Sequence, residues 1–340
     1  FPTFTRNGVA TMMTGAGPTA HGYLANRNRR GSRMPSVADL ADRAGIPTCA
    51  FWEGERIPSV FPRLDGHTRP LEIGLLPATG RHFTFVYLAE PDLVAHRLGG
   101  ASEAYRAEAL RVDARIGEIA RTIDLSAETM IVATDHGHLD QGGHGGHEEV
   151  VVRIPLVLVG AGVKRGVRIE DASSDLRDVA PTVSALLGLR LPPWTTGRPL
   201  REALDFPPPF DRERQPLPTD PVPMALARAM GTAALLAAAP FLLLRPRGRS
   251  SFALAAAAVA CCAGLYLALG RPLSCSPANT EAEVPRLVLE MAACAAIPFV
   301  ALHRLAPDRR SFVAAVLTLA AFLSGALAGW VGFRAPTALA

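Results

Sequence analysis

The sequence predicts an α/β domain with a mainly parallel sheet, followed by a transmembrane helical region. In residues 1–205, apolar runs of strand length alternate with segments of helical periodicity, which is the pattern of βαβ units. From about residue 222 onward the sequence is rich in Ala and Leu and is interrupted by short Arg-rich loops. With 340 residues the chain exceeds one typical domain. We therefore expect a globular domain over 1–205, a Pro-rich linker over 206–223 and a membrane domain over 224–340.

The first part of the globular domain predicts two helices and a strand. The segment from Thr5 through Met13 follows a Pro-Thr pair and is expected to be helical. Ser36–Ala44 has the pattern of a short amphipathic helix, with Ser36 as its N-cap and Gly45 as its stop. Thr48–Trp52 then reads as a strand.

The rest of the globular domain predicts further strands separated by helices. Ser102–Leu125 carries apolar side chains on one face at helical spacing, and it leads into the next strand as a right-handed crossover requires. The other expected elements are the strands His82–Leu88, Met130–Thr134 and Ile154–Val159 and a helix that begins at Asp175 and ends at Gly188.

The stretch MIVATDHGHLDQGGHGGHEEV, residues 130–150, concentrates residue types that bind metals. A buried strand ends at Asp135 and His136, and a Gly-rich loop with His144 follows. Four histidines and two aspartates lie within the thirteen residues from Asp135 to His147. A single histidine in such a loop would predict only a polar turn. This clustering instead predicts a metal site at the carboxyl end of the strand.

Three other side chains suit the same site. Asp92 and His96 follow the strand His82–Leu88, where a carboxylate and an imidazole can converge on one ion, although the start of a surface helix gives the same spacing. Thr5 stands at the start of a predicted helix. On position alone it is a cap for free N–H groups. The same position suits a nucleophile, because those groups and the helix dipole favour an anion such as phosphate.

Several short motifs occur in order along residues 1–203. They are P-T-x-T ending at Thr5, T-G at Thr14 and Gly15, Asn26, D-x-x-x-H at Asp92 and His96, D-H-G from Asp135 and H-G-G from His144. In this order and spacing they resemble the alkaline phosphatase superfamily. The resemblance is closest to its type I phosphodiesterase/nucleotide pyrophosphatase branch and to the GPI ethanolamine phosphate transferases. It implies a three-layer α/β domain.

The resemblance also implies a centre with two metal ions, which we expect to be zinc because mixed carboxylate and imidazole ligands suit Zn²⁺. By matching positions, one ion is held by Asp92, His96 and His144, and the second by Thr5, Asp135 and His136. Thr5 would be the nucleophile that attacks phosphorus, and Asn26 would donate hydrogen bonds to the non-bridging oxygens. His138 and His147 are additional histidines of the loop, and we expect them to support the ligands without binding the ions.

The family's second ion also takes an Asp from the first strand, upstream of the nucleophile, and this chain has four residues before Thr5. We therefore expect this polypeptide to bind one zinc poorly and to be weakly active or inactive, and we assign the function to the intact parent protein. The implied function is a membrane-anchored, metal-dependent phosphodiester hydrolase or phosphotransferase. One alternative is a phosphoethanolamine transferase acting on a lipid or glycan acceptor. The alternative of another class is a non-catalytic, membrane-anchored binding module.

The last third of the chain predicts four transmembrane helices, since spanning a bilayer takes about 20 apolar residues. The apolar segments are Met224–Leu244, Phe252–Leu269, Leu287–Leu302 and Phe312–Phe333. Arginine clusters at 245–249 and 304–310 predict cytoplasmic loops, which places the globular domain at the periplasm or cell exterior. The formal charge of +4 and pI near 9.0 therefore reflect membrane topology. We expect a membrane and a phosphate ester, including a lipid-linked one, as partners, and no nucleic acid.

Overall fold

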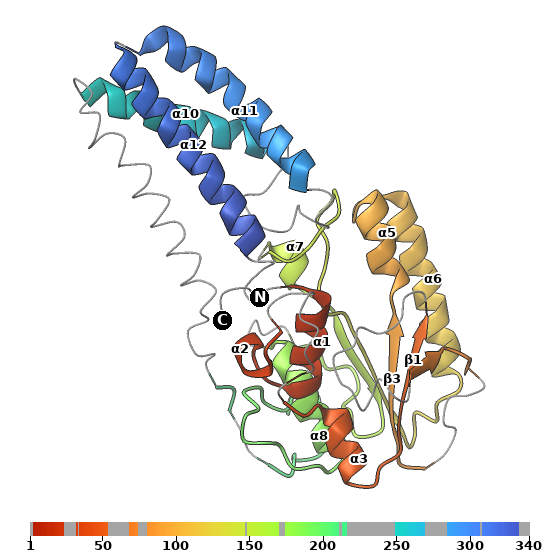
Figure 1. Ribbon diagram of the computed structural model, residues 1–340. Coiled ribbons are helices and arrows are strands. Elements are labelled where there is room, and N and C mark those ends of the chain that lie inside the picture. The colour runs from red at the N-terminus through yellow and green to blue at the C-terminus, as the bar shows by residue number, and fades with distance from the viewer. Residues whose placement is uncertain are drawn as a thin grey trace. The chain divides into compact units, whose positions relative to one another are not determined.

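The computed structural model describes residues 3–23, 32, 34–53, 68–73, 80–146, 148–169, 174–210, 213–215, 249–268, 284–306 and 308–332. The chain divides into two compact units, Phe1–Pro218 and Thr219–Ala340, and each is described by itself (Figure 1). The domain limits predicted from the sequence, near residues 205 and 223, stay predictions.

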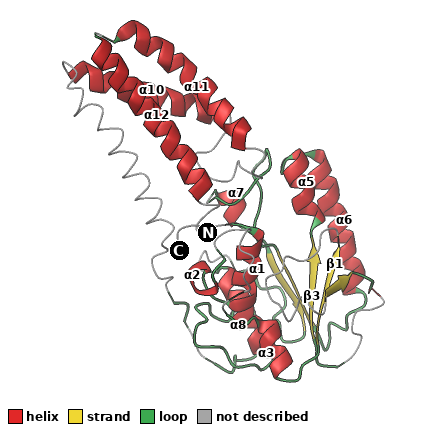
Figure 2. Ribbon diagram, in the orientation of Figure 1, coloured by secondary structure: helices red, strands yellow, loops and turns green. Residues whose placement is uncertain are grey.

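A parallel sheet in the first unit confirms the predicted α/β class (Figure 2). Its strand order is β2-β1-β3, with β2 at Thr68–Pro70, β1 at Thr48–Glu53 and β3 at Phe83–Leu88. Strands β1 and β3 pair over their whole length, from Thr48 opposite Phe83 to Glu53 opposite Leu88. The central strand therefore has a parallel neighbour on each side, and the carboxyl ends of all three meet at one edge.

Two further strands form an antiparallel pair, β4 (Thr129–Ala133) and β5 (Leu156–Gly160). The description "mainly parallel" therefore holds for the three-stranded sheet and not for this pair. The cause lies in the connection, because parallel strands need a long crossover that is usually helical. The connection from β4 to β5 carries the Gly-rich loop and only the four-residue helix α7 (Glu149–Val152).

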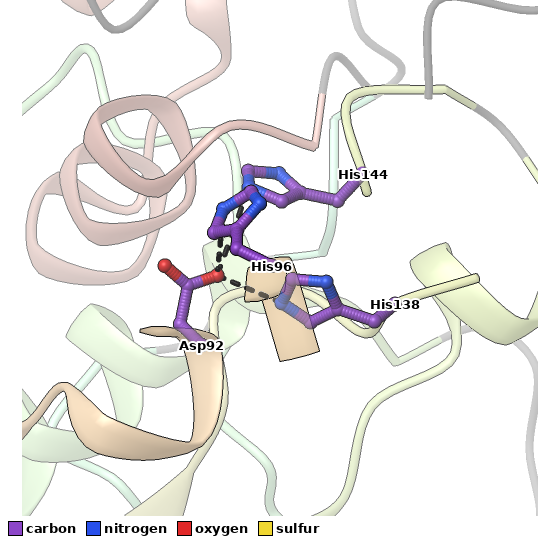
Figure 3. A group of neighbouring side chains, drawn as sticks. All are labelled: Asp92, His96, His138 and His144. Atoms are coloured by element: carbon purple, nitrogen blue, oxygen red, sulfur yellow. Dashed lines mark hydrogen bonds and ion pairs between the residues drawn. The ribbon is translucent and has the colours of Figure 1, made fainter. Parts of the chain in front are cut away.

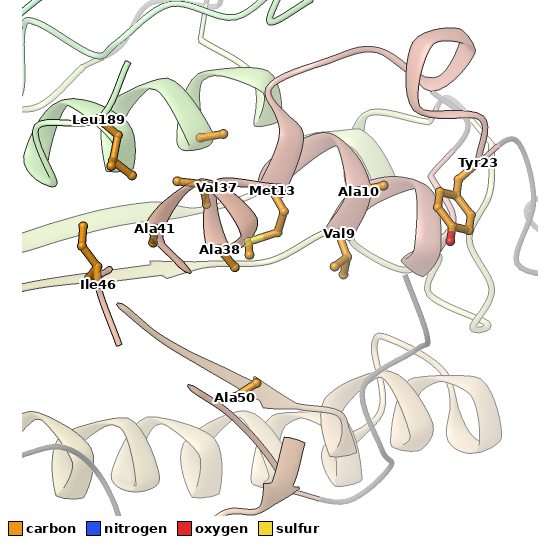
Figure 4. Packing of buried hydrophobic residues seen from close by; sticks show 11 residues of the cluster. Val9, Ala10, Met13, Tyr23, Val37, Ala38, Ala41, Ile46, Ala50 and Leu189 are labelled. Carbon is orange, nitrogen blue, oxygen red and sulfur yellow. The ribbon is translucent and has the colours of Figure 1, made fainter. Parts of the chain in front are cut away.

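Helices cover both faces of the parallel sheet, which gives three layers. On one face lie α1 (Thr5–Thr14), α3 (Val37–Arg43) and α8 (Val179–Leu186), and on the other lies α6 (Glu103–Ala120). Alternate residues of each strand point to opposite layers. The first core contains Val9 and Met13 of α1, Val37 and Ala41 of α3 and Ala50 of β1 (Figure 4). Phe85 of β3 packs against it. The second contains Phe51 of β1, Val86 of β3 and Ile119 of α6.

Local hydrogen bonds set the helix limits. Ser36 forms a capping box with Asp39 at the start of α3, as the sequence predicted for its N-cap. Helix α6 begins after Ser102, whose hydroxyl accepts from the N–H of Tyr105, but it ends at Ala120 and not at Leu125. Beyond it, the Asp124 carboxylate accepts from the N–H and hydroxyl of Ser126, at 3.0 and 2.6 Å, which favours a turn. The shorter elements are α2 (Pro18–His21), α5 (Glu90–Leu98) and the 3₁₀ turn η2 (Leu176–Asp178).

His21 is a fully buried polar side chain beside α1. Its Nδ1 accepts from the backbone N–H of Tyr23 at 3.2 Å, so Nε2 carries the proton and donates to Thr11 Oγ1 at 3.0 Å. Burial lowers the pKa of His21 to about 3. The imidazole is therefore neutral in the folded protein at ordinary pH.

Replacing His21 with glutamine is expected to flatten the pH dependence of the free energy of unfolding between about pH 3 and 6.5. In that range the unfolded wild-type chain binds a proton at His21 that the folded chain does not bind, so stability falls as the pH falls. The slopes should differ by up to about 1.4 kcal/mol per pH unit. Urea unfolding of both proteins across this range measures the slopes, and equal slopes would rule out His21 as the titrating group.

The described part of the second unit consists of the helices α10 (Arg249–Ala268), α11 (Val284–Leu305) and α12 (Arg309–Gly332). They pack through small and apolar side chains, which include Ala255, Ala258, Leu302 and Ala315. Three of the four predicted apolar segments fall on these helices, and Met224–Leu244 lies outside the described residues. Where the structure describes this unit, no helix has the combined length and hydropathy that crossing a membrane requires.

Candidate metal centre

Asp92 and His96 lie on helix α5, which begins directly after β3. The sequence left open whether this spacing reflects a metal site or only the start of a helix. The structure shows that Asp92 lies in the first turn of a helix, and this helix brings the two side chains together. They are separated by one helical turn on the same face, with 3.4 Å between His96 Nε2 and Asp92 Oδ1. Because a single residue separates the end of β3 from the start of α5, Asp92 and His96 lie beyond the carboxyl end of that strand.

The Gly-rich loop after β4 is held against the segment that precedes α1. Thr3 Oγ1 accepts from the N–H of Gly145 and donates to the carbonyl of Gly146, both at 2.9 Å. Gly145 has a φ of +114°, and a Cβ there would lie 2.5 Å from Phe4 Cε1, so only glycine allows this approach. The loop thereby places His144 beside Thr3, two residues before the start of α1.

Three imidazoles converge on the Asp92 carboxylate (Figure 3). The distances from Asp92 Oδ1 to Nε2 are 2.7 Å for His138, 3.4 Å for His96 and 3.7 Å for His144. One ligand atom from each of Asp92, His96, His138 and His144 lies within 4.8 Å of the others. The structure thus brings together the three residues predicted for the first ion and adds a fourth.

Thr5 lies at the start of α1, beside the residues that follow β4. Phe4 is the N-cap, so Thr5 is the first helical residue and not the cap. Its Oγ1 lies 3.3 Å from His136 Nε2, which in turn lies 3.4 Å from Asp135 Oδ2. The close packing of α1 on this strand end depends on Gly8, where a Cβ would lie 2.7 Å from Asp135 Cβ. The three residues predicted for the second ion are therefore neighbours.

A hydrogen bond and burial keep the Nε2 of His144 available as a ligand. The Nδ1 of His144 donates to the carbonyl of Thr3 at 2.6 Å, which leaves Nε2 unprotonated and facing the cluster. Burial, together with the charge of His136, lowers the pKa of His144 well below its ordinary value. Burial raises the pKa of Asp92, but the hydrogen bond from His138 and the nearby imidazoles outweigh it and hold this pKa well below its usual range.

The donor set fits a divalent metal ion. Carboxylate oxygens and neutral imidazoles are ligands for such ions, and both sets contain them. Burial raises the pKa of Asp135, and its buried Oδ2 has no hydrogen-bond partner among the described residues. A cation at this position would supply the missing partner and favour the ionised carboxylate.

Two of the loop and binding residues considered in the sequence cannot be placed. Asn26, the expected donor to phosphate oxygens, and His147 lie outside the described residues. His138 was expected to support ligands, and the structure sets it among them. The spacing between His138 and Asp135 does not predict where the His138 side chain points, because the conformation of a Gly-rich loop does not follow from residue spacing.

Residues 74–191 match the sequence profile described as "Metalloenzyme: Metalloenzyme superfamily". Over this segment the chain is similar to the alkaline phosphatase-like Metalloenzyme superfamily. The Metalloenzyme segment includes Asp92, His96, Asp135, His136, His138 and His144, and Thr5 lies upstream of it. The superfamily predicted from the motifs is thereby confirmed, and the type I phosphodiesterase branch stays a prediction.

Curated relatives of this chain include 2,3-bisphosphoglycerate-independent phosphoglycerate mutases. That of Rhodopirellula baltica is 34% identical over 129 residues, which cover 34% of this chain and 22% of the relative. That of Cereibacter sphaeroides is 32% identical over 182 residues, which cover 51% and 33%. The chain therefore spans between a fifth and a third of their length. Among solved structures, phosphonate monoester hydrolase SpPMH from Silicibacter pomeroyi aligns with a TM-score of 0.40 and 14% identity, over 60% of this chain and 68% of that one.

Proposed function

We propose that the protein is a metal-dependent phosphoryl-transfer enzyme, a phosphodiester hydrolase or phosphotransferase, with Thr5 as nucleophile and two zinc ions. The observation that carries the proposal is the position of Thr5 Oγ1, 3.3 Å from His136 Nε2 at the start of a ten-residue helix and beside the His/Asp cluster. The Metalloenzyme match supports a divalent metal, and the donor set favours zinc.

The chain's own residues supply a nucleophile and a place for the phosphoryl group. Thr5 Oγ would attack phosphorus as the bond to the leaving oxygen breaks, which gives a phosphothreonine ester that water or an acceptor hydroxyl then cleaves. The free N–H groups at the start of α1 would hold the non-bridging oxygens, and Asn26 is proposed to add a donor there. Bound zinc would lower the pKa of the attacking hydroxyl and stabilise charge on the attacking and leaving oxygens.

Asp92, His96 and His144 are proposed to hold one ion, and Thr5, Asp135 and His136 the other. The first set is supported by its mutual distances and by the unprotonated Nε2 of His144. The second set is supported by the unpartnered Oδ2 of Asp135 and its proximity to His136.

Removing metal is expected to abolish turnover of bis(p-nitrophenyl) phosphate by the intact protein, and adding zinc should restore it. The physical reason is that without the ions the Thr5 hydroxyl keeps its high pKa and is a weak nucleophile. Treatment with a chelator, dialysis and addition of Zn²⁺, with Mg²⁺ as the comparison ion, measures this. Undiminished turnover after complete removal of metal would refute the proposal, whereas binding of zinc without turnover would favour the non-catalytic binding module.

A transferase is the second candidate, favoured by the apolar segments of the last third of the sequence. This layout of several apolar segments also resembles that of the GPI ethanolamine phosphate transferases. Incubation with a phosphoethanolamine lipid donor and a glycan or lipid acceptor distinguishes the two candidates. A transferase gives a new acceptor ester with little free hydrolysis, and a hydrolase gives the free products. The mutase relatives make interconversion of phosphoglycerates a further reaction to assay.

Membrane attachment, with the globular unit outside the cytoplasm, is also a proposal and rests on the sequence alone. Its support is the pattern of apolar segments and of arginines between them. Extraction of membranes with alkaline carbonate, followed by protease treatment of intact cells, measures both properties. Release of the protein by carbonate would contradict integral attachment.

A further inference from the structure

His138 occupies a place in the cluster that the two proposed ligand sets leave unassigned. Three imidazoles, those of His96, His138 and His144, surround the Asp92 carboxylate. Their ring centroids are 5.1 Å apart for His96 and His138, 5.1 Å for His138 and His144, and 4.9 Å for His96 and His144. The three ring centroids therefore form a nearly equilateral triangle. Figure 3 shows the three side chains beside Asp92.

This triangle has the dimensions of three imidazoles on one tetrahedral ion. With a Zn–N bond of about 2.0–2.1 Å, tetrahedral angles place ligand nitrogens about 3.3 Å apart and ring centroids about 5.2 Å apart. The Nε2 atoms of His96 and His144 are 3.1 Å apart, and Asp92 Oδ1 lies 2.7 to 3.7 Å from the three Nε2 atoms. Three nitrogens and one oxygen thus approach the corners of one tetrahedron.

The fourth imidazole of the region does not fit the same ion. His136 stacks on His144 with ring centroids 3.7 Å apart and an angle of 10° between the planes. Two stacked rings cannot both point their nitrogens at one ion from separate corners of a tetrahedron. His136 Nε2 lies 3.8 Å from Asp92 Oδ1 but closer to Thr5 Oγ1, at 3.3 Å. His136 is not one of the four residues whose ligand atoms all lie within 4.8 Å of one another.

The backbone on both sides of His138 is fixed, and its ring is buried. The N–H of Gly137 donates to the carbonyl of Val151 at 2.8 Å, and the N–H of Leu139 to that of Gly143 at 2.9 Å. The carbonyl of Leu139 also accepts from the N–H of Gly100 at 3.2 Å. Among the described residues, the Nδ1 of His138 has no hydrogen-bond partner. The ring is therefore positioned by the loop and directs its Nε2 at the cluster.

We propose that His138 is a fourth protein ligand of the first ion, which Asp92, His96 and His144 share. This inference rests on the proposed metal centre. It adds to that centre a histidine that the sequence motifs do not include among the ligands. Four protein donors complete a tetrahedral shell, whereas catalytic zinc sites with three leave one position open. A phosphate oxygen that reaches this ion must then displace His138 or enter as a fifth donor.

The test compares His138→Gln with the wild type. Glutamine can still donate an N–H to Asp92 Oδ1, so it preserves an orienting hydrogen bond while removing the imidazole ligand. We expect zinc affinity, measured by competition with a chromophoric chelator, to fall by more than about 100-fold, which is above the upper end of the roughly 10- to 100-fold loss that follows removal of an outer partner. His82→Gln, on the same unit and away from the cluster, is the matched control and should bind zinc normally.

X-ray absorption at one equivalent of zinc gives an independent measurement on the unaltered protein. Scattering from imidazole rings should count three histidines in the wild type and in His82→Gln, and two in His138→Gln. Two imidazoles in the wild type, or unchanged affinity in His138→Gln, would overturn the inference and leave the proposed function standing. A wild-type protein that binds no zinc would overturn both. Circular dichroism of each variant separates loss of a ligand from loss of folding.

Discussion

Replacing Thr5 with alanine is expected to reduce turnover of a model phosphodiester by at least about 10⁴-fold while zinc stays bound. Alanine removes the only atom proposed to bond to phosphorus. The remaining protein donors of each ion, including Asp135 and His136 at the second, are untouched. Steady-state hydrolysis of bis(p-nitrophenyl) phosphate and metal analysis of the same samples measure the two effects together.

Thr5→Ser is the matched variant, because serine keeps the hydroxyl at the start of α1. It should retain measurable turnover, reduced far less than that of Thr5→Ala. The β-branch of Thr5 is lost in serine, so the attacking oxygen becomes less restricted about χ1. Turnover of Thr5→Ala within tenfold of the wild type, at full zinc content, would remove Thr5 as the nucleophile.

Replacing His144 with alanine is expected to abolish turnover together with zinc binding at the first site. Its Nε2 lies 3.1 Å from that of His96, and its Nδ1 is held by the Thr3 carbonyl at 2.6 Å, so the ring is fixed as a donor toward the cluster. Without the His144 imidazole, the first ion loses one of its proposed ligands. Zinc content by elemental analysis after gel filtration, compared with the wild type, measures the loss.

His82→Ala serves as the control for His144→Ala, because it also removes one partly buried imidazole from the same unit. His82 Nε2 pairs with Glu128 at 3.4 Å, at the opposite end of β3 from α5. This variant should keep both its zinc and its turnover. Equal zinc contents in His144→Ala and the wild type would contradict the assignment of His144 as a ligand.

The contrast between Thr5→Ala and His144→Ala separates two ways of losing activity. In the first, the ions remain and the attacking atom is gone. In the second, the ion itself is lost, so high concentrations of added zinc should recover part of the turnover in His144→Ala and none in Thr5→Ala. This difference follows from mass action, since excess metal refills a weakened site but cannot replace a missing oxygen.

The helices and strands that position the centre follow from local patterns in the sequence. Ser36 and the apolar face of α3, the apolar run of β3 and the entry into α1 each carry their own signal. Strand β2 could not be found in this way, because Thr68–Pro70 is three residues long and shows no alternation. The antiparallel pairing of β4 with β5 depends on how a long loop returns, which periodicity does not encode.

The sequence motifs named residues that the structure brings together, but they did not give the arrangement of those residues. The motif spacing singled out Asp92, His96, Asp135, His136 and His144, and the structure brings them together beyond the ends of β3 and β4. His138 differs because its direction depends on backbone bonds from Gly137 to Val151 and from Gly100 to Leu139, between segments far apart in the chain. Such long-range contacts leave no periodic trace in the sequence.

The stereochemistry of hydrolysis tests most directly whether the reaction passes through Thr5. A P-chiral phosphorothioate diester, hydrolysed by the zinc-loaded intact protein in ¹⁸O-labelled water, gives a product whose configuration at phosphorus can be determined. Attack by Thr5 followed by attack of water comprises two in-line displacements, each with inversion, so the expected result is net retention. Net inversion would show a single displacement by water and would contradict a covalent intermediate on Thr5.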